Sequence, residues 1–330
     1  MAGHKSLPLN DLYRSIQSDL NDVEGRLREI SSSANPLIAE VNRYLFQKGG
    51  KRIRPALLIL AAKMCGYKGA EHVFWSALVE IIHTASLIHD DIVDNSTRRR
   101  GQDTVHTRWG ANISVLLGDY LYIQSIALAL KTKIYPIINL LADVTAAMVE
   151  GELIEFSVSG RADLSEDTYL EILDKKTAAL FSCACRIGGL LAGVPPGQEE
   201  KLHEFGTSLG LAFQIVDDLL DFRGEEKSMG KPVLMDFREG RITLPLIHAV
   251  RAARGRNRAR LIELIEHRKT RRAAPREVRD LVLAAGGLDY AHERAADFVR
   301  KAKESLAEFP AVEHRRSLER IADLVLQRNS

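Results

Sequence analysis

Apolar residues recur at intervals of three and four positions along nearly the whole chain, which is the spacing of amphipathic helices. No segment alternates apolar and polar residues as a half-buried strand does. Several of the expected helices carry apolar residues on all of their faces, which is typical of helices inside a protein core. The pattern predicts an all-α protein with long helices over 73–90, 113–130, 135–156, 179–194, 202–222 and 246–253.

Glycine and proline separate these helices, as at Gly49-Gly50, at Pro195-Pro196-Gly197 and at Gly286-Gly287. None of the breaks has the composition of a flexible linker, and each has apolar helices on both sides. We therefore expect residues 1–330 to form a single all-helical domain.

Charge and cysteine content narrow the class of protein. The 46 basic residues nearly balance the 44 acidic ones, which argues against generic nucleic-acid binding. The three cysteines, Cys65, Cys183 and Cys185, are too few for a disulfide framework and form no CxxC pair, so a reducing compartment is expected. The N-terminus lacks an apolar signal core, and no stretch approaches the roughly 20 apolar residues that span a bilayer. We expect a soluble, cytoplasmic protein.

The motif DDxxD occurs twice, each time at the end of an apolar helical run. Its outer carboxylates are four residues apart and lie on one helix face within roughly 5–6 Å of each other. The last turn of a helix also presents the negative end of the macrodipole, so these acids are doubly unfavourable. The arrangement should persist only with a compensating cation, and a divalent metal is the natural candidate. The six acids are Asp90, Asp91 and Asp94 in the first cluster, and Asp217, Asp218 and Asp221 in the second.

A single DDxxD could equally be an exposed acidic helix end. Two copies, each after buried apolar residues, favour a metal site instead. Magnesium takes carboxylate oxygens and completes its coordination with water and a substrate's phosphates. The two clusters therefore suggest a diphosphate held between them.

A bound diphosphate also calls for lysine and arginine, which supply point charge and bidentate donors. Each candidate could be an ordinary surface charge by itself, but together they match the charge of two phosphate groups. His83 lies two helical turns before Asp90 and Gln214 one turn before Asp217, so both should share the faces of the acids. His83 could also be a core histidine, as we expect of His89. The cations are Lys51, Arg52 and Arg54, then Arg98, Arg99 and Arg100, and finally Lys176 and Lys231.

These motifs together resemble the trans-isoprenyl (polyprenyl) diphosphate synthase family over about 49–247. The resemblance implies an isoprenoid synthase fold, a large helical bundle around a central cavity and usually a homodimer, with segment 1–45 packing on the core or on the dimer partner. Glu155, where many relatives have glutamine, and Arg241, where lysine is common, depart from the pattern. The matching segments, in the family's order, are GGKRIRP, HTASLIHDDIVDNSTRRRG, GDYL, EGE, KTAALF, FQIVDDLLDF, GKP and EGRITLPLI.

The resemblance implies an enzyme that joins isopentenyl diphosphate head-to-tail to an allylic diphosphate, with three Mg²⁺ ions per active site. The six aspartates would hold the metal. Arg99, Lys176 and Lys231 would bind the allylic diphosphate, and Lys176, Thr177, Gln214 and Lys231 would act at the reacting allylic carbon or its leaving group. Lys51, Arg54, His83 and Arg100 would bind isopentenyl diphosphate. No nucleic acid is expected as a partner, and at most peripheral membrane contact for long products.

Two small residues before the first acidic cluster, Ala85 and Ser86, stand where bulky aromatics in the family halt growth at farnesyl length. A small pair leaves the cavity open, so the product is expected to be geranylgeranyl diphosphate or a longer all-trans polyprenyl diphosphate. The same small residues could instead only permit tight helix packing.

Two other functions fit parts of the pattern. A terpene cyclase would also use magnesium, but it normally mixes other residues into its second motif and has no need of Lys51, Arg54 and His83. A regulatory subunit of a heteromeric synthase would tend to lose acids, whereas both clusters are complete here.

Overall fold

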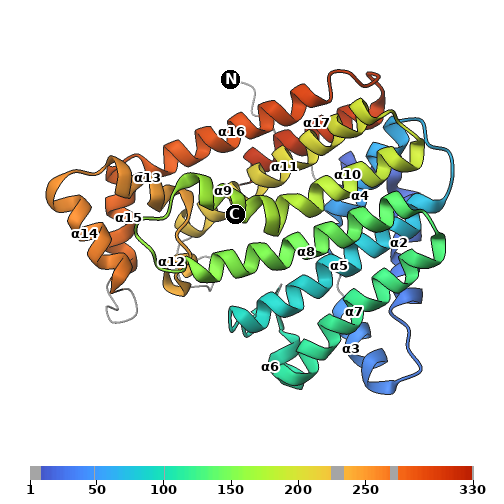
Figure 1. Ribbon diagram of the computed structural model, residues 1–330, viewed down its shortest axis with the longest axis horizontal. Helices are drawn as coiled ribbons and strands as arrows, with labels where there is room; N and C mark the ends of the chain where they lie inside the picture. Colours follow the sequence, from blue (N-terminus) through green and yellow to red (C-terminus); the bar gives the residue numbers. More distant parts are fainter. Residues whose placement is uncertain (1–8, 48, 100, 224–233, 268–273, 329–330) are drawn as a thin grey trace. The chain divides into compact units, whose positions relative to one another are not determined.

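A computed structural model describes residues 9–47, 49–99, 101–223, 234–267 and 274–328, and this part of the chain is almost entirely helical (Figure 1). The chain divides into two compact units, which are described separately. Unit 1 comprises Met1–Thr145, Leu180–His203 and Leu306–Leu318, and unit 2 comprises Ala146–Ala179, Glu204–Ser305 and Glu319–Ser330. The expectation of one domain over the whole chain stays a prediction.

The helices begin and end close to where the apolar pattern placed them. Unit 1 contains α1 (Leu9–Leu12), the 3-10 helix η1 (Arg14–Ile16), α2 (Gln17–Ile30), α3 (Pro36–Gln47), α4 (Ile53–Met64), α5 (Glu71–Val93), α6 (Val105–Trp109) and α7 (Ala111–Thr132). Unit 2 contains α9 (Glu166–Leu173), the π-helix η2 (Asp174–Ala178), α12 (Met235–Glu239), α13 (Leu244–Ala252), α14 (Gly255–Glu266), α15 (Ala274–Ala284) and α16 (Gly287–Ser305). Four helices contribute residues to both units: α8 (Tyr135–Ser157), α10 (Ala179–Ala192), α11 (Pro196–Arg223) and α17 (Glu313–Leu326).

Helix α5 is at the centre of unit 1, where it packs against α2, α4 and α7. Every residue of α4 from Ala56 to Ala62 is fully buried, as expected for a helix that is apolar on all sides. Gly188 of α10 lies so close to α4 that a Cβ there would be 2.6 Å from the Leu58 carbonyl oxygen. The packing of α2 on α4 and α5 also fixes the N-terminal segment on this core.

A short antiparallel hairpin follows α5, with strand β1 (Arg98–Arg99) paired to β2 (Gln102–Asp103). The sequence predicted no strand, and the reason is that two residues are too few to show an alternating pattern. Gly101 has φ of +75°, which suits the tight turn between the strands.

Helix α7 is long and apolar enough to cross a membrane by length and composition, with a mean hydropathy of 1.6 over its best window. The expectation that no stretch is apolar enough was therefore wrong for this helix. It packs against α5 and α6 within unit 1. Its outer face carries a row of exposed apolar residues seven positions apart, Leu116, Ile123 and Leu130.

In unit 2, α13 packs on α16, and α15 contacts α13, α14 and α16 (Figure 1). The contact between α13 and α16 includes His248 and Tyr290, whose rings stack with centroids 4.2 Å apart. Gly287 begins α16 where a Cβ would be 2.3 Å from the Pro245 carbonyl oxygen, so only glycine permits this approach.

Candidate active site

The first acidic cluster closes α5, as the sequence predicted. Asp90 and Asp91 lie in its last turn, and Asp94 is its C-terminal cap. Asn95 follows with φ of +50°, a conformation that asparagine tolerates and that ends helices. The amide of Ser96 then donates to the Asp91 carbonyl oxygen at 2.9 Å. The local sequence therefore ends the helix directly after its acids.

Asp91 is the buried member of this cluster, with 6% of its surface exposed. Its Oδ1 accepts a hydrogen bond from Arg99 Nε of the hairpin at 2.7 Å. Burial raises the pKa of Asp91, although the Arg99 guanidinium opposes this effect. The structure thus joins two residues that the sequence predicted to act on the same diphosphate.

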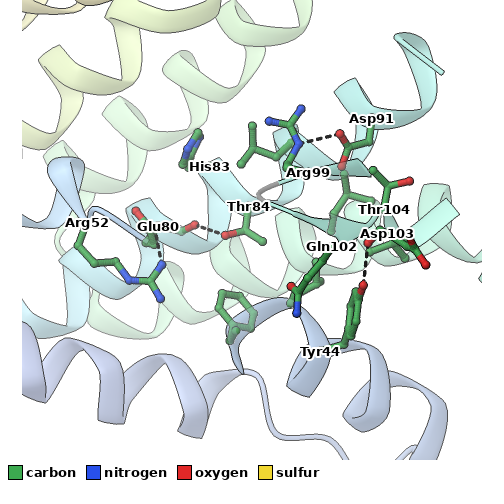
Figure 2. A pocket seen from close by; sticks show the side chains of 15 residues that line it. Tyr44, Arg52, Glu80, His83, Thr84, Asp91, Arg99, Gln102, Asp103 and Thr104 are labelled. Carbon is green, nitrogen blue, oxygen red and sulfur yellow. Dashed lines mark hydrogen bonds and ion pairs between the residues drawn. The ribbon is translucent and has the colours of Figure 1, made fainter. Parts of the chain in front are cut away.

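Asp91 and Arg99 line a pocket of unit 1 together with His83, Thr84 and Glu80 of α5 (Figure 2). His83 and Asp91 of the first acidic cluster therefore line the same pocket. The far end of the pocket is formed by α3 and the hairpin, where Tyr44 donates a hydrogen bond to the Asp103 carbonyl oxygen at 2.7 Å (Figure 2).

Among the described residues of the segment Lys51 to Arg54, the one that lines this pocket is Arg52 (Figure 2). The Lys51 carbonyl oxygen accepts a hydrogen bond from Tyr13 at 3.2 Å. The Arg54 guanidinium lies 4.6 Å from the centre of the Phe181 ring. Arg100 and Lys231, both predicted to bind diphosphate, lie outside the described residues.

The two small residues of α5 have different surroundings. Ala85 is fully buried in unit 1. Ser86 is partly exposed, and its hydroxyl donates to the His83 carbonyl oxygen at 2.8 Å. Ala85 therefore has close neighbours, and a larger side chain there must displace them.

The second acidic cluster lies in the last turns of α11, which ends at Arg223. Asp218 is 5% exposed, whereas half of the Asp217 side chain is exposed. Arg328, near the end of the chain, reaches Asp217 Oδ1 at 3.3 Å and lies over the Phe213 ring at 4.5 Å. The sequence analysis did not identify Arg328.

Asp218 is held by two hydrogen bonds. Tyr169 of α9 donates to its Oδ2 at 2.7 Å, and Gln214 Nε2 donates to its Oδ1 at 3.0 Å. Gln214 in turn accepts from the Thr177 hydroxyl at 3.0 Å. Three of the predicted residues are therefore connected in one network, while Tyr169 was missed.

Asp221 accepts hydrogen bonds from the backbone amides of Met235 and Asp236, each at 3.0 Å. Burial, and next the charge of Asp236, raises the pKa of Asp221 to about 6. Burial also raises the pKa of Asp236, which Arg241 opposes through a hydrogen bond at 2.9 Å. The acidic cluster thus contains a fourth carboxylate, Asp236, that the sequence analysis did not include.

Lys176 lies in the π-helix η2, a rare form that is frequent at functional sites. Its ammonium group contacts Glu152 and Glu155 of α8, each at 2.6 Å. The approach of α8 depends on Gly151, because a Cβ there would lie 2.9 Å from the Lys176 amide nitrogen. Glu155, which departs from the family pattern, therefore contacts Lys176, a residue predicted to bind the allylic diphosphate.

The donor groups suit magnesium. Within the described ranges, no group of three or more His, Cys, Asp or Glu side chains encloses a metal by itself. An ion held here would need water or substrate phosphate as further ligands, which is how Mg²⁺ is usually bound. Burial, and next the charge of Asp236, raises the pKa of Asp218 and of Asp221, so a divalent cation would relieve an existing excess of negative charge.

The family model described as polyprenyl synthetase matches residues 35–282. An octaprenyl diphosphate synthase of Haemophilus influenzae is 35% identical over 323 residues, which are 98% of each chain. Among solved structures, a decaprenyl diphosphate synthase from Rhodobacter capsulatus is 38% identical, with a TM-score of 0.92 and coverage of 97% of this chain and 99% of that one. A polyprenyl synthase from Caulobacter crescentus, complexed with calcium and isoprenyl diphosphate, is 37% identical, with a TM-score of 0.92 and coverage of 99% and 100%.

Proposed function

Because the chain belongs to the polyprenyl synthetase family and is a prenyltransferase, we propose that it lengthens an allylic diphosphate by condensation with isopentenyl diphosphate. The observation that carries this proposal is the pair of complete acidic clusters, each closing a helix and each paired with an arginine, Arg99 at Asp91 and Arg328 at Asp217. A cyclase would not need the cations around His83, and a regulatory subunit would not need both sets of acids.

The six aspartates bind Mg²⁺, and Arg99, Lys176 and Lys231 bind the allylic diphosphate. Lys51, Arg54, His83 and Arg100 bind isopentenyl diphosphate. Three Mg²⁺ ions per active site, as in the sequence-based expectation, would neutralise the leaving diphosphate. The calcium and isoprenyl diphosphate in the Caulobacter crescentus protein support a divalent metal and a prenyl diphosphate as ligands here.

Ionisation of the allylic diphosphate creates a delocalised carbocation and a strongly anionic leaving group. Lys176 and Arg99 stabilise the charge that develops on the phosphate oxygens, which is where a preorganised cation acts most strongly. Both cations have carboxylate partners, so diphosphate binding would exchange one anionic partner for another.

The hydroxyl of Thr177 and the amide of Gln214 are connected by a hydrogen bond beside Asp218. We assign them to the reacting carbon, where neutral dipoles can stabilise a cation without attacking it. After the isopentenyl double bond attacks, a proton is lost to the departed diphosphate, and no protein nucleophile is required.

The product is geranylgeranyl diphosphate or a longer all-trans polyprenyl diphosphate. The small side chains of Ala85 and Ser86 support this range. The names of similar proteins, which run from geranylgeranyl to octaprenyl and decaprenyl diphosphate synthases, are compatible with it.

The enzyme acts as a homodimer in the cytoplasm. Support for the dimer comes from the exposed row of Leu116, Ile123 and Leu130 on α7, whose heptad spacing is that of helix-pairing seams. Helix α8 also exposes Leu153 and Phe156, at 65% and 77%.

The proposed function is tested with purified chain, labelled isopentenyl diphosphate, Mg²⁺ and allylic primers of several lengths, followed by sizing of the products. A series of elongated diphosphates is the expected result. A hydrocarbon formed without isopentenyl diphosphate would identify a cyclase, and inactivity of the folded chain alone would identify a regulatory subunit. Chelation of Mg²⁺ should abolish elongation.

A further inference from the structure

Arg52 has a backbone conformation that is unfavourable for arginine and for most other residues with a side chain. It precedes α4 with φ of 47° and ψ of 38°, in the left-handed region. Such a conformation persists only where the surrounding structure enforces it, and it is frequent beside functional sites. Arg52 stands between Lys51 and Arg54, the two residues of this segment assigned to isopentenyl diphosphate.

The side chain of Arg52 is buried, with 9% of its surface exposed. Its Nη1 donates to Glu80 Oε1 of α5 at 2.6 Å (Figure 2). Its Nε and Nη2 donate to the two carboxylate oxygens of Glu24 in α2, at 2.5 and 3.2 Å. One guanidinium therefore connects the start of α4 to both α2 and α5.

The carboxylates on both sides of Arg52 accept hydrogen bonds from all three of its guanidinium nitrogens, and a buried ion pair of this kind is costly to break on one side. Glu80 is 4% exposed and lies one turn before His83 on α5. The ion pair thus connects the segment of Lys51 and Arg54 to the helix that carries His83. The Tyr13 hydrogen bond to the Lys51 carbonyl oxygen holds the same segment from another side.

We propose that Arg52 is a positioning residue, whose ion pairs with Glu24 and Glu80 hold Lys51 and Arg54 in place for isopentenyl diphosphate. It does not bind the diphosphate itself. The inference rests on the proposed function, because it assumes that Lys51 and Arg54 bind that substrate.

The main test compares the KM for each substrate in Arg52→Gln, Glu80→Gln and Glu24→Gln. Each variant should raise the KM for isopentenyl diphosphate about tenfold, with kcat and the KM for the allylic diphosphate changed less than about threefold. The two glutamate variants decide the mechanism. If Arg52 were a diphosphate ligand, removing a neighbouring carboxylate would free its charge and lower the KM for isopentenyl diphosphate.

The double variant Arg52→Gln/Glu80→Gln should raise the KM for isopentenyl diphosphate no further than Arg52→Gln alone, because the two residues act through one ion pair. Additive effects on KM would overturn the proposal, as would equal loss of kcat and of both affinities. Arg52→Lys, which keeps the positive charge, should raise the KM for isopentenyl diphosphate less than Arg52→Gln does.

Arg52→Gly and Arg52→Ala separate the backbone from the ion pair. Both variants lose the guanidinium, but glycine adopts a φ of 47° without strain. The KM for isopentenyl diphosphate should therefore rise less in Arg52→Gly than in Arg52→Ala. Lys133, with φ of 60° after α7, provides the matched control. Lys133→Gly and Lys133→Ala should differ in thermal stability but not in KM.

Thermal unfolding of every variant establishes that it is folded. If Arg52→Gln does not fold, the Glu24→Gln variant still tests the proposal, because Glu24 is partly exposed. A wild-type chain that condenses no isopentenyl diphosphate would refute the proposed function. An active wild type with an unchanged KM in folded Glu24→Gln and Glu80→Gln would refute only the role of Arg52.

Discussion

The phenol of Tyr169 donates a hydrogen bond to Asp218 Oδ2 at 2.7 Å, with both side chains buried. The two residues are 49 positions apart in the chain. Burial, and next the charge of Asp236, raises the pKa of Asp218, which the hydrogen bonds from Tyr169 and Gln214 oppose. Tyr169 therefore favours the charged carboxylate that would bind a metal.

Tyr169→Phe should destabilise the folded protein by about 1–3 kcal/mol, because it leaves a buried acceptor without its donor. It should also weaken Mg²⁺ binding, since the pKa of Asp218 rises further without the phenol. Chemical denaturation and titration of Mg²⁺ followed by thermal shift measure the two effects. Tyr290→Phe is the matched control, because Tyr290 donates to Glu166 outside the acidic cluster. Equal Mg²⁺ affinity in both variants would contradict the role given to Tyr169.

The pH dependence of metal binding should reflect Asp221. Its pKa is raised to about 6, so the folded protein takes up this proton more readily than the unfolded chain. Protonation of Asp221 therefore favours the folded state as the pH falls through about 6, but it removes a metal ligand. The Mg²⁺-induced rise in melting temperature should be full at about pH 7.5 and decline below about pH 6.

Asp236→Asn should move that decline to lower pH, because the charge of Asp236 contributes to the raised pKa of Asp221. Thermal shift measured with and without Mg²⁺ across the pH range checks both statements. An Mg²⁺ effect that stays constant down to about pH 5 would show that Asp221 does not bind the metal.

Ala85→Phe should shorten the product. Ala85 is fully buried, so the larger ring must occupy space on the inner side of α5 and should cost about 1–3 kcal/mol in stability. Product sizing by chromatography measures the chain length, and Ser86→Ala, which only removes a hydroxyl, should leave it unchanged. A folded Ala85→Phe variant with the wild-type product distribution would refute the open-cavity hypothesis.

The exposed row on α7 should control assembly. Leu116→Glu combined with Ile123→Glu places two charges on residues that are 65% and 69% exposed in the single chain. The variant should remain folded but sediment as a monomer, because the charges would have to be buried at the interface. Asn112→Glu, an exposed polar position on the same helix, should remain dimeric. A dimeric double variant would place the interface elsewhere.

Much of this architecture could be predicted because it depends on local sequence. The helical spacing of apolar residues located α5, α7, α8 and α11, and the acids at the ends of α5 and α11 followed from numbering alone. The register of His83 with Asp90 likewise needs only the helical repeat. The family resemblance then supplied the roles that spacing cannot give.

The remaining contacts depend on residues far apart in the chain. Arg52 looked like one more phosphate-binding cation, because its partners Glu24 and Glu80 are each 28 residues away and carry no motif. Asp236 and Tyr169 reach the second acidic cluster only through the packing of their helices. No local pattern predicted the π-helix, since its sequence also fits an ordinary α-helix.

That π-helix has a geometric consequence for the chain. Thr177 is eight positions after Tyr169, and in a regular α-helix the two side chains would point about 80° apart. The additional residue accommodated by a π-turn reduces the angle to about 20°. Tyr169 can then donate to Asp218, while Thr177 donates to Gln214, which itself donates to Asp218. Removing a single residue from η2 would leave a continuous helix, yet it would rotate one of these hydroxyls away from the other.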